Sequence, residues 1–250
     1  MNDVEAISER VEAAEEVVAL TGAGLSTASG IPDFRSEGGL WDEFDESAFT
    51  IRRFHARPED FWRDWLSLHD HFFEESVMPN PAHDALARLE SAGHLDALLT
   101  QNVDGLHVAA GSDAVVHLHG TGTEATCQDC GASIPVEQAR ERVQNGETPL
   151  RCDCGGALKP DTVLFGERLP VAALQRARER AESADVFVAA GSSLTVEPVA
   201  SLPRTALRAG ATLVVVNLDE TTYDDRADHV VHEPVEEVLP AVADAVLDVQ

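Results

Sequence analysis

The sequence predicts an α/β protein in which a Rossmann-like parallel sheet carries a small zinc-ribbon plus helical domain. Short apolar runs alternate with helical segments along most of the 250 residues, a pattern typical of a parallel sheet covered by helices. All four cysteines fall between residues 123 and 160, in two close pairs, which indicates a metal-stabilised module. Hydrophobic residues make up 44% of the chain, enough for one large domain, or one large and one small domain.

Residues 17–35 contain the first strand and a glycine turn. The stretch opens with the apolar run VVAL, expected to be a buried strand, and continues with Gly22-Ala23-Gly24. In α/β proteins, a glycine turn that enters a helix offers free N–H groups and a positive helix end to a dinucleotide pyrophosphate. Phe34 and Arg35 then supply a flat ring and a phosphate-matching guanidinium. Position 27 is Thr where the G-x-G-x-x-G fingerprint has glycine, so an ordinary turn and loop explain this stretch equally well.

Four further apolar runs and a last strand complete the predicted sheet, at residues 95–99, 114–118, 186–190, 212–216 and 229–231. The first four lead into polar residues: Gln101, Asn102 and Asp104, then His119, then Ser192 and Ser193, then Asn217. Because the carboxyl ends of parallel strands meet at one edge, where ligands bind in open sheets, we expect a functional site there.

Helices are expected at residues 3–16, 58–76, 81–92, 170–183, 198–209 and 234–247, while residues 36–80 carry no strong strand. The helix at 58–76 carries an apolar stripe that should pack inward rather than bind a cofactor: Phe61, Trp62, Trp65, Leu68 and Phe72. We therefore expect a Rossmann-like domain from 1–36, 81–122 and 161–250, a helical insertion at 37–80, and a zinc-binding module at 123–160.

The cysteines are arranged as Cys127-x-x-Cys130 and Cys152-x-Cys154. Two close pairs separated by about twenty residues indicate a tetrahedral four-cysteine zinc site, and glycines after each pair let the backbone turn around a metal. The second pair has one intervening residue where two are usual. A zinc ion with four thiolates has no open position, so the predicted metal is structural.

Acidic residues outnumber basic ones 45 to 18, a formal net charge of −27. This field repels phosphate backbones and disfavours direct binding to nucleic acid. The acids are spread along the chain, which suggests a halophilic source or a surface that attracts lysine-rich peptides. The N-terminal segment lacks the order of a signal peptide and no apolar run reaches eighteen residues, so a cytoplasmic protein without a membrane span is expected. A monomer is the working expectation.

Several short motifs occur in a specific order: Gly22-Ala23-Gly24-x-Ser26, residues 30–35 (GIPDFR), 100–107 (TQNVDGLH) and 118–120 (LHG), the cysteine pairs, then 159–161 (KPD), 165–167 (FGE), 191–194 (GSSL) and 216–217 (VN). In this respect the chain resembles the sirtuins, NAD-dependent protein-lysine deacylases, from about residue 12 to the last helix. The resemblance implies a Rossmann-like domain, one structural zinc, and substrate entry between the two domains. It also implies an NAD site lined by Gly22, Ala23, Gly24, Phe34, Arg35, Gln101, Asn102, Asp104, Ser192, Ser193, Asn217 and Val235.

The resemblance further implies an enzyme that consumes NAD to remove acetyl groups from protein lysines, releasing nicotinamide and O-acetyl-ADP-ribose. The substrate peptide would pair as an added strand with Val163 to Glu167, including Phe165 and Gly166. Sirtuins that prefer acidic acyl groups share a Tyr-x-x-Arg pair, whereas residues 61–76 here contain no Tyr and only Arg63. We therefore expect acetyl or other neutral acyl groups.

The predicted catalytic residues are His119, Asn102 and Asp104. Asn102 and Asp104 follow a strand and could hold ribose hydroxyls or an ordered water. The reaction needs a general base that titrates near neutrality, as histidine does. His117 and His119 share one strand face, and His119 lies at its end, where the Leu-His-Gly motif also selects it. His107 is expected to be structural, and His69, His71, His229 and His232 to be solvated.

Three other functions remain open at this point. The same residues could transfer ADP-ribose to protein or water. An NAD(H) oxidoreductase fits less well, because the glycine fingerprint is imperfect and no hydride-transfer site is evident. A non-catalytic zinc-ribbon binding module explains the cysteines but leaves Gln101, Asn102, Asp104 and His119 without a role.

If the surface is adapted to salt, the protein should melt at a higher temperature in molar KCl than in dilute buffer. Repulsion among the excess acids is screened within ~3 Å at 1 M salt. Melting curves at the two salt concentrations test this, and an unchanged melting temperature would contradict the salt-adapted surface.

Overall fold

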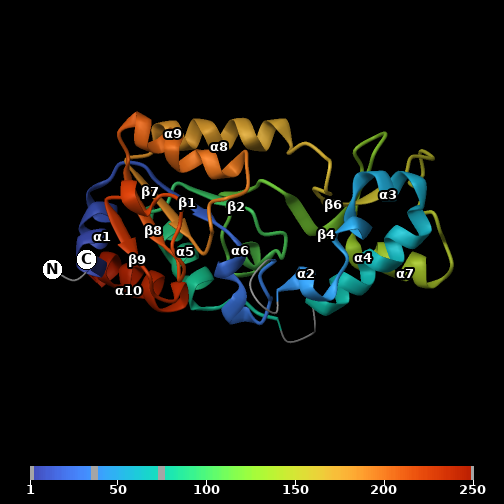
Figure 1. Ribbon diagram of the computed structural model, residues 1–250, viewed down its shortest axis with the longest axis horizontal. Helices are drawn as coiled ribbons and strands as arrows, with labels where there is room; N and C mark the ends of the chain where they lie inside the picture. Colours follow the sequence, from blue (N-terminus) through green and yellow to red (C-terminus); the bar gives the residue numbers. More distant parts are fainter. Residues whose placement is uncertain (1–2, 35–38, 73–76, 249–250) are drawn as a thin grey trace.

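The computed structural model describes residues 3–34, 39–72 and 77–248 and contains two sheets among them (Figure 1). The large sheet is parallel, with strand order β3-β2-β1-β7-β8-β9. Its strands are β1 (Val17–Thr21), β2 (Ala97–Thr100), β3 (Val115–His117), β7 (Val186–Ala190), β8 (Thr212–Val216) and β9 (His229–Val231). The predicted parallel sheet is confirmed, with β2 starting two residues later and β3 ending one residue earlier than expected.

The strand order explains where the functional edge lies. The chain runs from β1 outward through β2 to β3, and later returns beside β1 as β7 before continuing to β8 and β9. The β1–β7 border is therefore the point at which the strand order reverses, and ligands bind at the carboxyl ends of such strands. All residues of β1, β2 and β7 are buried, because helices cover both faces.

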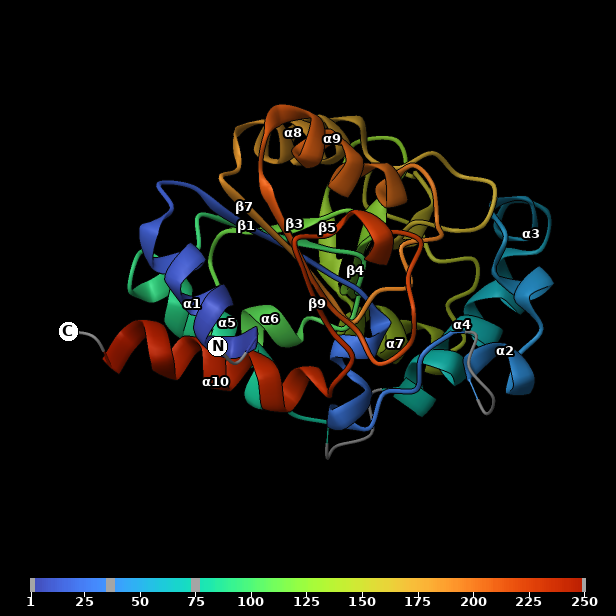
Figure 2. The same cartoon turned by 60° about the vertical axis from the view of Figure 1, so that its left-hand side comes forward.

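Helices α8 (Val171–Ser183) and α9 (Leu202–Ala209) lie on one face of the large sheet, and α1 (Asp3–Ala13), α5 (Pro81–Ser91) and α10 (Val235–Asp248) on the other (Figures 1 and 2). Two apolar clusters fill these layers. Side chains of β1 alternate between them, so that Val17 packs with the α1, α5 and α10 side and Val18 with the α8 and α9 side. No helix within the described residues is long and apolar enough to cross a bilayer.

A second sheet, order β5-β4-β6, lies at the other end of the molecule (Figure 1). Its antiparallel strands are β4 (Gly120–Cys127), β5 (Ser133–Pro135) and β6 (Leu158–Thr162). Around it lie α2 (Leu40–Glu43), α3 (Ile51–Ala56), α4 (Pro58–Phe72) and α7 (Val136–Gln144), while the short α6 (Leu106–Ala109) follows β2. The sheet begins and ends just outside residues 123–160, and the division into domains at the expected boundaries stays a prediction.

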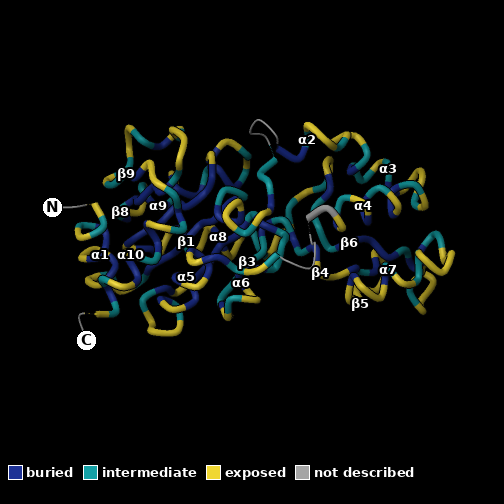
Figure 3. Tube along the Cα trace, turned by 90° about the horizontal axis from the view of Figure 1, so that it is seen from below, coloured by how far each residue is buried: buried dark blue, intermediate teal, exposed yellow. Residues whose placement is uncertain are grey.

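The apolar stripe of α4 packs inward as expected from Phe61 to Leu68, whereas the Phe72 side chain lies outside the described part of the structure. Phe61 and Trp62 are fully buried and Trp65 is nearly so, in a cluster with the core side of β4 and α7. The Trp62 indole N–H donates to the Leu158 carbonyl, 3.2 Å away, which ties α4 to β6. Figure 3 shows α4 and α7 with buried inner and exposed outer positions. The stripe therefore joins the helical segment to the cysteine-bearing sheet.

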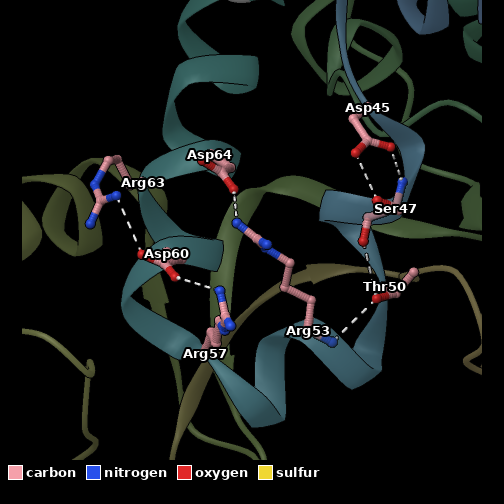
Figure 4. Close-up of polar contacts among 8 residues, drawn as sticks. All are labelled: Asp45, Ser47, Thr50, Arg53, Arg57, Asp60, Arg63 and Asp64. Atoms are coloured by element: carbon pink, nitrogen blue, oxygen red, sulfur yellow. Dashed lines mark hydrogen bonds and ion pairs between the residues drawn. The ribbon is translucent and has the colours of Figure 1, made fainter.

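Polar contacts hold α3 against α4 (Figure 4). Arg53 on α3 pairs with Asp64 on α4 at 2.5 Å, and Thr50 caps α3 by accepting a bond from the Arg53 N–H at 3.2 Å. Arg57 and Arg63 both approach Asp60. Partly exposed pairs of this kind contribute up to about 1 kcal/mol each, so they add to the apolar packing between α3 and α4 without dominating it.

Two local features add to the expected pattern. The chain after β1 forms two short 3₁₀ turns, Ala23–Leu25 and Thr27–Ser29. Within 36–80, where no strong strand was expected and the described residues form none, Thr50 makes an isolated parallel bridge with Phe165. The bridge brings the segment before α3 against the predicted peptide-binding residues.

Candidate functional site

The glycine turn after β1 packs directly against the loop after β7. Gly22 N–H donates to the Ala190 carbonyl at 3.2 Å, and Gly24 N–H donates to the Gly191 carbonyl at 2.9 Å. A Cβ at Gly22 would lie 2.7 Å from the Gly191 oxygen, closer than any real side chain. The glycines thus let two loops meet at the switch point. We had expected their N–H groups to be free for a phosphate, but the N–H groups of Gly22 and Gly24 are both bonded within the protein. Ala23 N–H, which starts the first 3₁₀ turn, has no backbone acceptor among the described residues.

Asn102 and Asp104, after β2, are bonded to this turn. Asn102 Nδ2 donates to the Gly22 carbonyl at 3.0 Å and to Ser26 Oγ at 3.1 Å. Ser26 Oγ donates to Asp104 Oδ2 at 2.7 Å, and Asp104 Oδ1 accepts the Leu106 N–H at 2.9 Å. Ser26 belongs to the first motif but was not expected in the site, and the Asp104 carboxylate across from it is the partner that gives it a role.

Gln101 connects the β7 loop to His119. Its side-chain amide donates to Ser192 Oγ at 2.8 Å, and its carbonyl oxygen lies 3.2 Å from His119 Nδ1. A carbonyl can only accept, so Nδ1 carries the proton and Nε2 keeps a basic lone pair. Burial lowers the pKa of His119 below its ordinary value, and the bond to Gln101 partly offsets this effect. At neutral pH His119 is a neutral base with one fixed nitrogen.

A layer of buried histidines lies beneath these residues. His107 Nε2 is 2.9 Å from Thr21 Oγ1, and its ring contacts His83 with centroids 4.8 Å apart. His107 is 2% exposed, and burial lowers its pKa to about 3. His83 Nδ1 accepts the Asn80 N–H at 3.3 Å. These contacts agree with a structural role for His107.

The expectation that His69 is solvated was wrong. The ring is 6% exposed, stacks on Trp65 with centroids 5.0 Å apart, and lies 2.8 Å from Arg140 Nη2. Burial, and then the charge of Arg140, lowers the pKa of His69 to about 4. Position 69 follows Trp62 and Trp65 at helical spacing, which was the available signal for burial.

The predicted peptide segment, residues 163–167, connects the two parts of the molecule. Val163 N–H donates to the His119 carbonyl at 2.8 Å, and Phe165 N–H donates to the Phe49 carbonyl at 3.1 Å. The Phe165 carbonyl in turn accepts the Ile51 N–H at 3.0 Å. The Phe165 ring is 36% exposed and lies 5.5 Å from Trp41 between centroids. His119 is therefore bonded to the peptide segment through its backbone and to Gln101 through its ring.

The remaining predicted NAD residues are more scattered. Phe34 contacts Trp41 with ring centroids 5.7 Å apart, and Ser193 is exposed at the β7 loop. Asn217 Nδ2 donates to the Asp219 carbonyl at 2.8 Å. Val235, the first residue of α10, is 4% exposed and packs in the core between α10 and the large sheet. Arg35 lies outside the described residues. Binding of NAD by these residues stays a prediction.

The four cysteine sulfurs converge, all within 4.8 Å of one another. Cys127 and Cys154 Sγ are 3.5 Å apart, and Cys130 and Cys152 Sγ are 3.7 Å apart. Zinc–sulfur bonds of about 2.3 Å in a tetrahedron place sulfurs about 3.8 Å apart, so the cluster fits one structural zinc. Backbone N–H groups of Cys130 and Asp129 lower the pKa of Cys127 to about 7, which favours the thiolate that binds metal. The one-residue spacing of the second pair does not prevent convergence.

The chain is similar to a well-defined group of proteins. Residues 22–198 match the model of the Sir2 family. The NAD-dependent protein deacetylase of Haloarcula marismortui is 50% identical over 246 residues, covering 96% of this chain and 94% of the relative. NAD-dependent protein deacetylase 1 of Pyrobaculum aerophilum is 48% identical over 227 residues, 91% of this chain and 88% of the relative.

Solved structures of Sir2 proteins are also similar to this chain. A Sir2 homologue in complex with NAD has a TM-score of 0.86 at 38% identity and covers 98% of this chain and 94% of its own. A complex of Sir2 with a p53 peptide and NAD⁺ has a TM-score of 0.84 at 38% identity and covers 95% of each chain.

Replacing Gly156 should weaken the zinc site, because a Cβ there would lie 2.6 Å from Cys127 Sγ. We expect Gly156→Ala to hold less than one zinc per chain, as measured by elemental analysis after dialysis. Gly155→Ala is the matched control: its added Cβ meets nothing within 4 Å, so it costs about 1 kcal/mol of backbone strain and keeps the metal. Equal zinc content in the two variants would contradict the packing argument.

Proposed function

This chain belongs to the Sir2 family and is an NAD-dependent protein deacetylase, and we propose that His119 is the general base of its reaction. One observation carries the proposal. His119 accepts the Val163 N–H through its carbonyl and donates from Nδ1 to Gln101, which in turn bonds to Ser192. The same residue is thus anchored to the peptide segment and to the edge of the parallel sheet where a dinucleotide would bind.

NAD, when bound, supplies an electrophilic ribose carbon that accepts the acetyl oxygen as nicotinamide leaves. The position of the switch point between β1 and β7 supports an NAD site at this edge of the sheet, since the glycines let the backbone of both loops meet there. We propose that Gly22, Ala23, Gly24, Gln101, Ser192, Ser193 and Asn217 line the site, together with Phe34, Arg35 and Val235.

Asn102 and Asp104 would act on the ribose or on an ordered water. Both amide protons of Asn102 are donated within the protein, to Gly22 and Ser26, so the Oδ1 oxygen is the atom left to accept from a hydroxyl. Asp104 is oriented by the Ser26 hydroxyl and the Leu106 N–H. Such preorganised contacts let proximity and orientation supply much of the rate for a weak amide nucleophile.

We propose that His119 Nε2 takes the proton from a ribose hydroxyl. Because Nδ1–H is held by the Gln101 carbonyl, the lone pair on Nε2 has a fixed direction. The lowered pKa keeps the imidazole neutral, and therefore competent as a base, at neutral pH. No metal takes part, since a zinc with four cysteine ligands has no open position.

We propose that the acyl group is acetyl or another neutral group. The exposed Phe165 ring, Trp41 and Phe34 form an apolar surface beside the peptide segment. Arg63, the one arginine in residues 61–76, is bonded to Asp60 at 3.3 Å and points to solvent. It therefore offers no cation to an acidic acyl group.

The net charge of −27 supports basic, lysine-rich peptides as substrates. The acidic composition and the relative from the halophile Haloarcula marismortui both support a salt-adapted surface. Monomeric state, cytoplasmic location and the absence of nucleic-acid binding stay predictions.

The decisive variant is His119→Ala, assayed with NAD and an acetyl-lysine peptide in high-salt buffer with mass-resolved products. We expect a normally folded protein that loses turnover by roughly 10²–10⁴-fold, the range for removing a general base. His55→Ala, an exposed histidine on α3, is the matched control and should keep its activity. Near-normal deacetylation by His119→Ala would overturn the assignment, and nicotinamide release with the acetyl group retained would favour ADP-ribosyl transfer.

The acidic limb of the profile of kcat/KM against pH should lie below pH 6.5. Protonation removes the base, and burial lowers the pKa of His119, so the neutral form persists to lower pH than for a solvated histidine. A limb at or above pH 6.5 would contradict a buried base.

Folding must be monitored in parallel by circular dichroism. His69 and His107 have folded-state pKa values of about 4 and about 3, below the unfolded value near 6.5. The unfolded state binds their protons first, so stability falls as pH drops below about 6.5.

A further inference from the structure

Lys159 is the only lysine in the chain, and it is buried. Its side chain, on β6, is 8% exposed. Nζ donates to the Thr162 carbonyl at 2.6 Å and to the Pro160 carbonyl at 2.9 Å, and it pairs with Glu167 Oε2 at 3.1 Å. An ammonium has three N–H groups, so all three donors have an acceptor.

Glu167 extends this contact to the peptide segment. Its Oε2 atom, which pairs with Lys159, also accepts the Leu164 N–H at 2.7 Å. The chain therefore forms a closed loop from Lys159 through residues 160–167, joined by one ion pair and three bonds to backbone groups. With the Glu167 side chain only 19% exposed, solvent screens the pair weakly.

The loop holds the segment from its inner side. Val163 and Phe165 bond outward to His119, Phe49 and Ile51, whereas the Leu164 N–H and the Thr162 carbonyl turn toward the ion pair. Without Lys159, the Thr162 and Pro160 carbonyls would lose their donor and the Glu167 carboxylate would be left buried and unpaired. An unpaired buried charge is unfavourable, so Glu167 would move toward water and release Leu164.

We propose that Lys159 is a positioning residue for substrate: with Glu167 it fixes the backbone of residues 163–167, in which the Glu167 N–H closes a turn on the Leu164 carbonyl at 2.9 Å, so that an acylated-lysine peptide can pair with this segment. The inference rests on the proposed function of this segment. A segment fixed in its binding conformation binds more tightly because its backbone entropy is lost before the peptide arrives. Lys159 touches neither the peptide nor NAD in this role.

The composition of the chain supports a geometric requirement for lysine. Of 18 basic residues one is Lys, so the other 17 are Arg. The position that keeps lysine is the one where three acceptors surround a compact head group. A planar guanidinium has a fixed fork of donors and cannot reach the same three acceptors, so Lys159→Arg keeps the charge but not the contacts.

The test measures peptide and NAD parameters separately for Lys159→Met, Lys159→Arg and Glu167→Gln. Freeing one or two residues of backbone weakens peptide binding on the order of tenfold each. We expect the peptide KM to rise by about that factor in all three variants, with the KM for NAD nearly unchanged. The double variant Lys159→Met with Glu167→Gln should resemble the single ones, because one interaction is removed in each.

Binding of a fluorescent acetyl-lysine peptide, followed by anisotropy, separates this inference from the reaction itself. Weaker binding by the variants supports the role of Lys159 even if turnover proves to be ADP-ribosyl transfer. Zinc content and melting curves establish that each variant is folded, and Glu167→Gln, nearly isosteric, serves if Lys159→Met is not. An unchanged peptide affinity in a folded variant, or Lys159→Arg behaving as wild type, would overturn the proposal.

Discussion

The close approach of two backbone loops at the β1–β7 border is the constraint on which the rest of the site depends. A Cβ at Gly22 or Gly191 would collide with backbone atoms of the opposite loop. Residues after β2 bond to both loops, Asn102 to the Gly22 carbonyl and Gln101 to Ser192. The glycines are therefore required for the packing of the two loops, and this packing places the carboxyl ends of the strands where a ligand can bind.

His119 shows how a single position can connect the two parts of the molecule. It stands where the chain leaves the parallel sheet and enters β4 of the second sheet. Its ring bonds back to the first sheet through Gln101, while its carbonyl bonds forward to Val163. A shift between the two parts of the molecule would break one of these two bonds, and would move the proposed base relative to one substrate or the other.

Much of this could be predicted from local sequence, and the remainder depends on contacts between distant residues. The buried strands follow from continuous apolar runs, and the zinc cluster from the spacing of Cys127, Cys130, Cys152 and Cys154. The Ser26–Asp104 bond and the Thr50–Phe165 bridge join residues far apart in the chain, and no local pattern encodes them. The two 3₁₀ turns after β1 likewise depend on a distant contact, because Gly24 there bonds to the β7 loop. For His69, the helical spacing from Trp62 and Trp65 indicated burial, but we expected solvation because the side chain is polar.

The burial of Lys159 has a consequence for how the enzyme relates to its own chemistry. Acylating metabolites modify exposed, unprotonated amines, and the folded chain presents no lysine amine to them, because its single lysine is enclosed by three acceptors. An enzyme that removes acyl groups from lysines, and whose own single lysine is enclosed in this way, is therefore not itself a target of lysine acylation in its folded state.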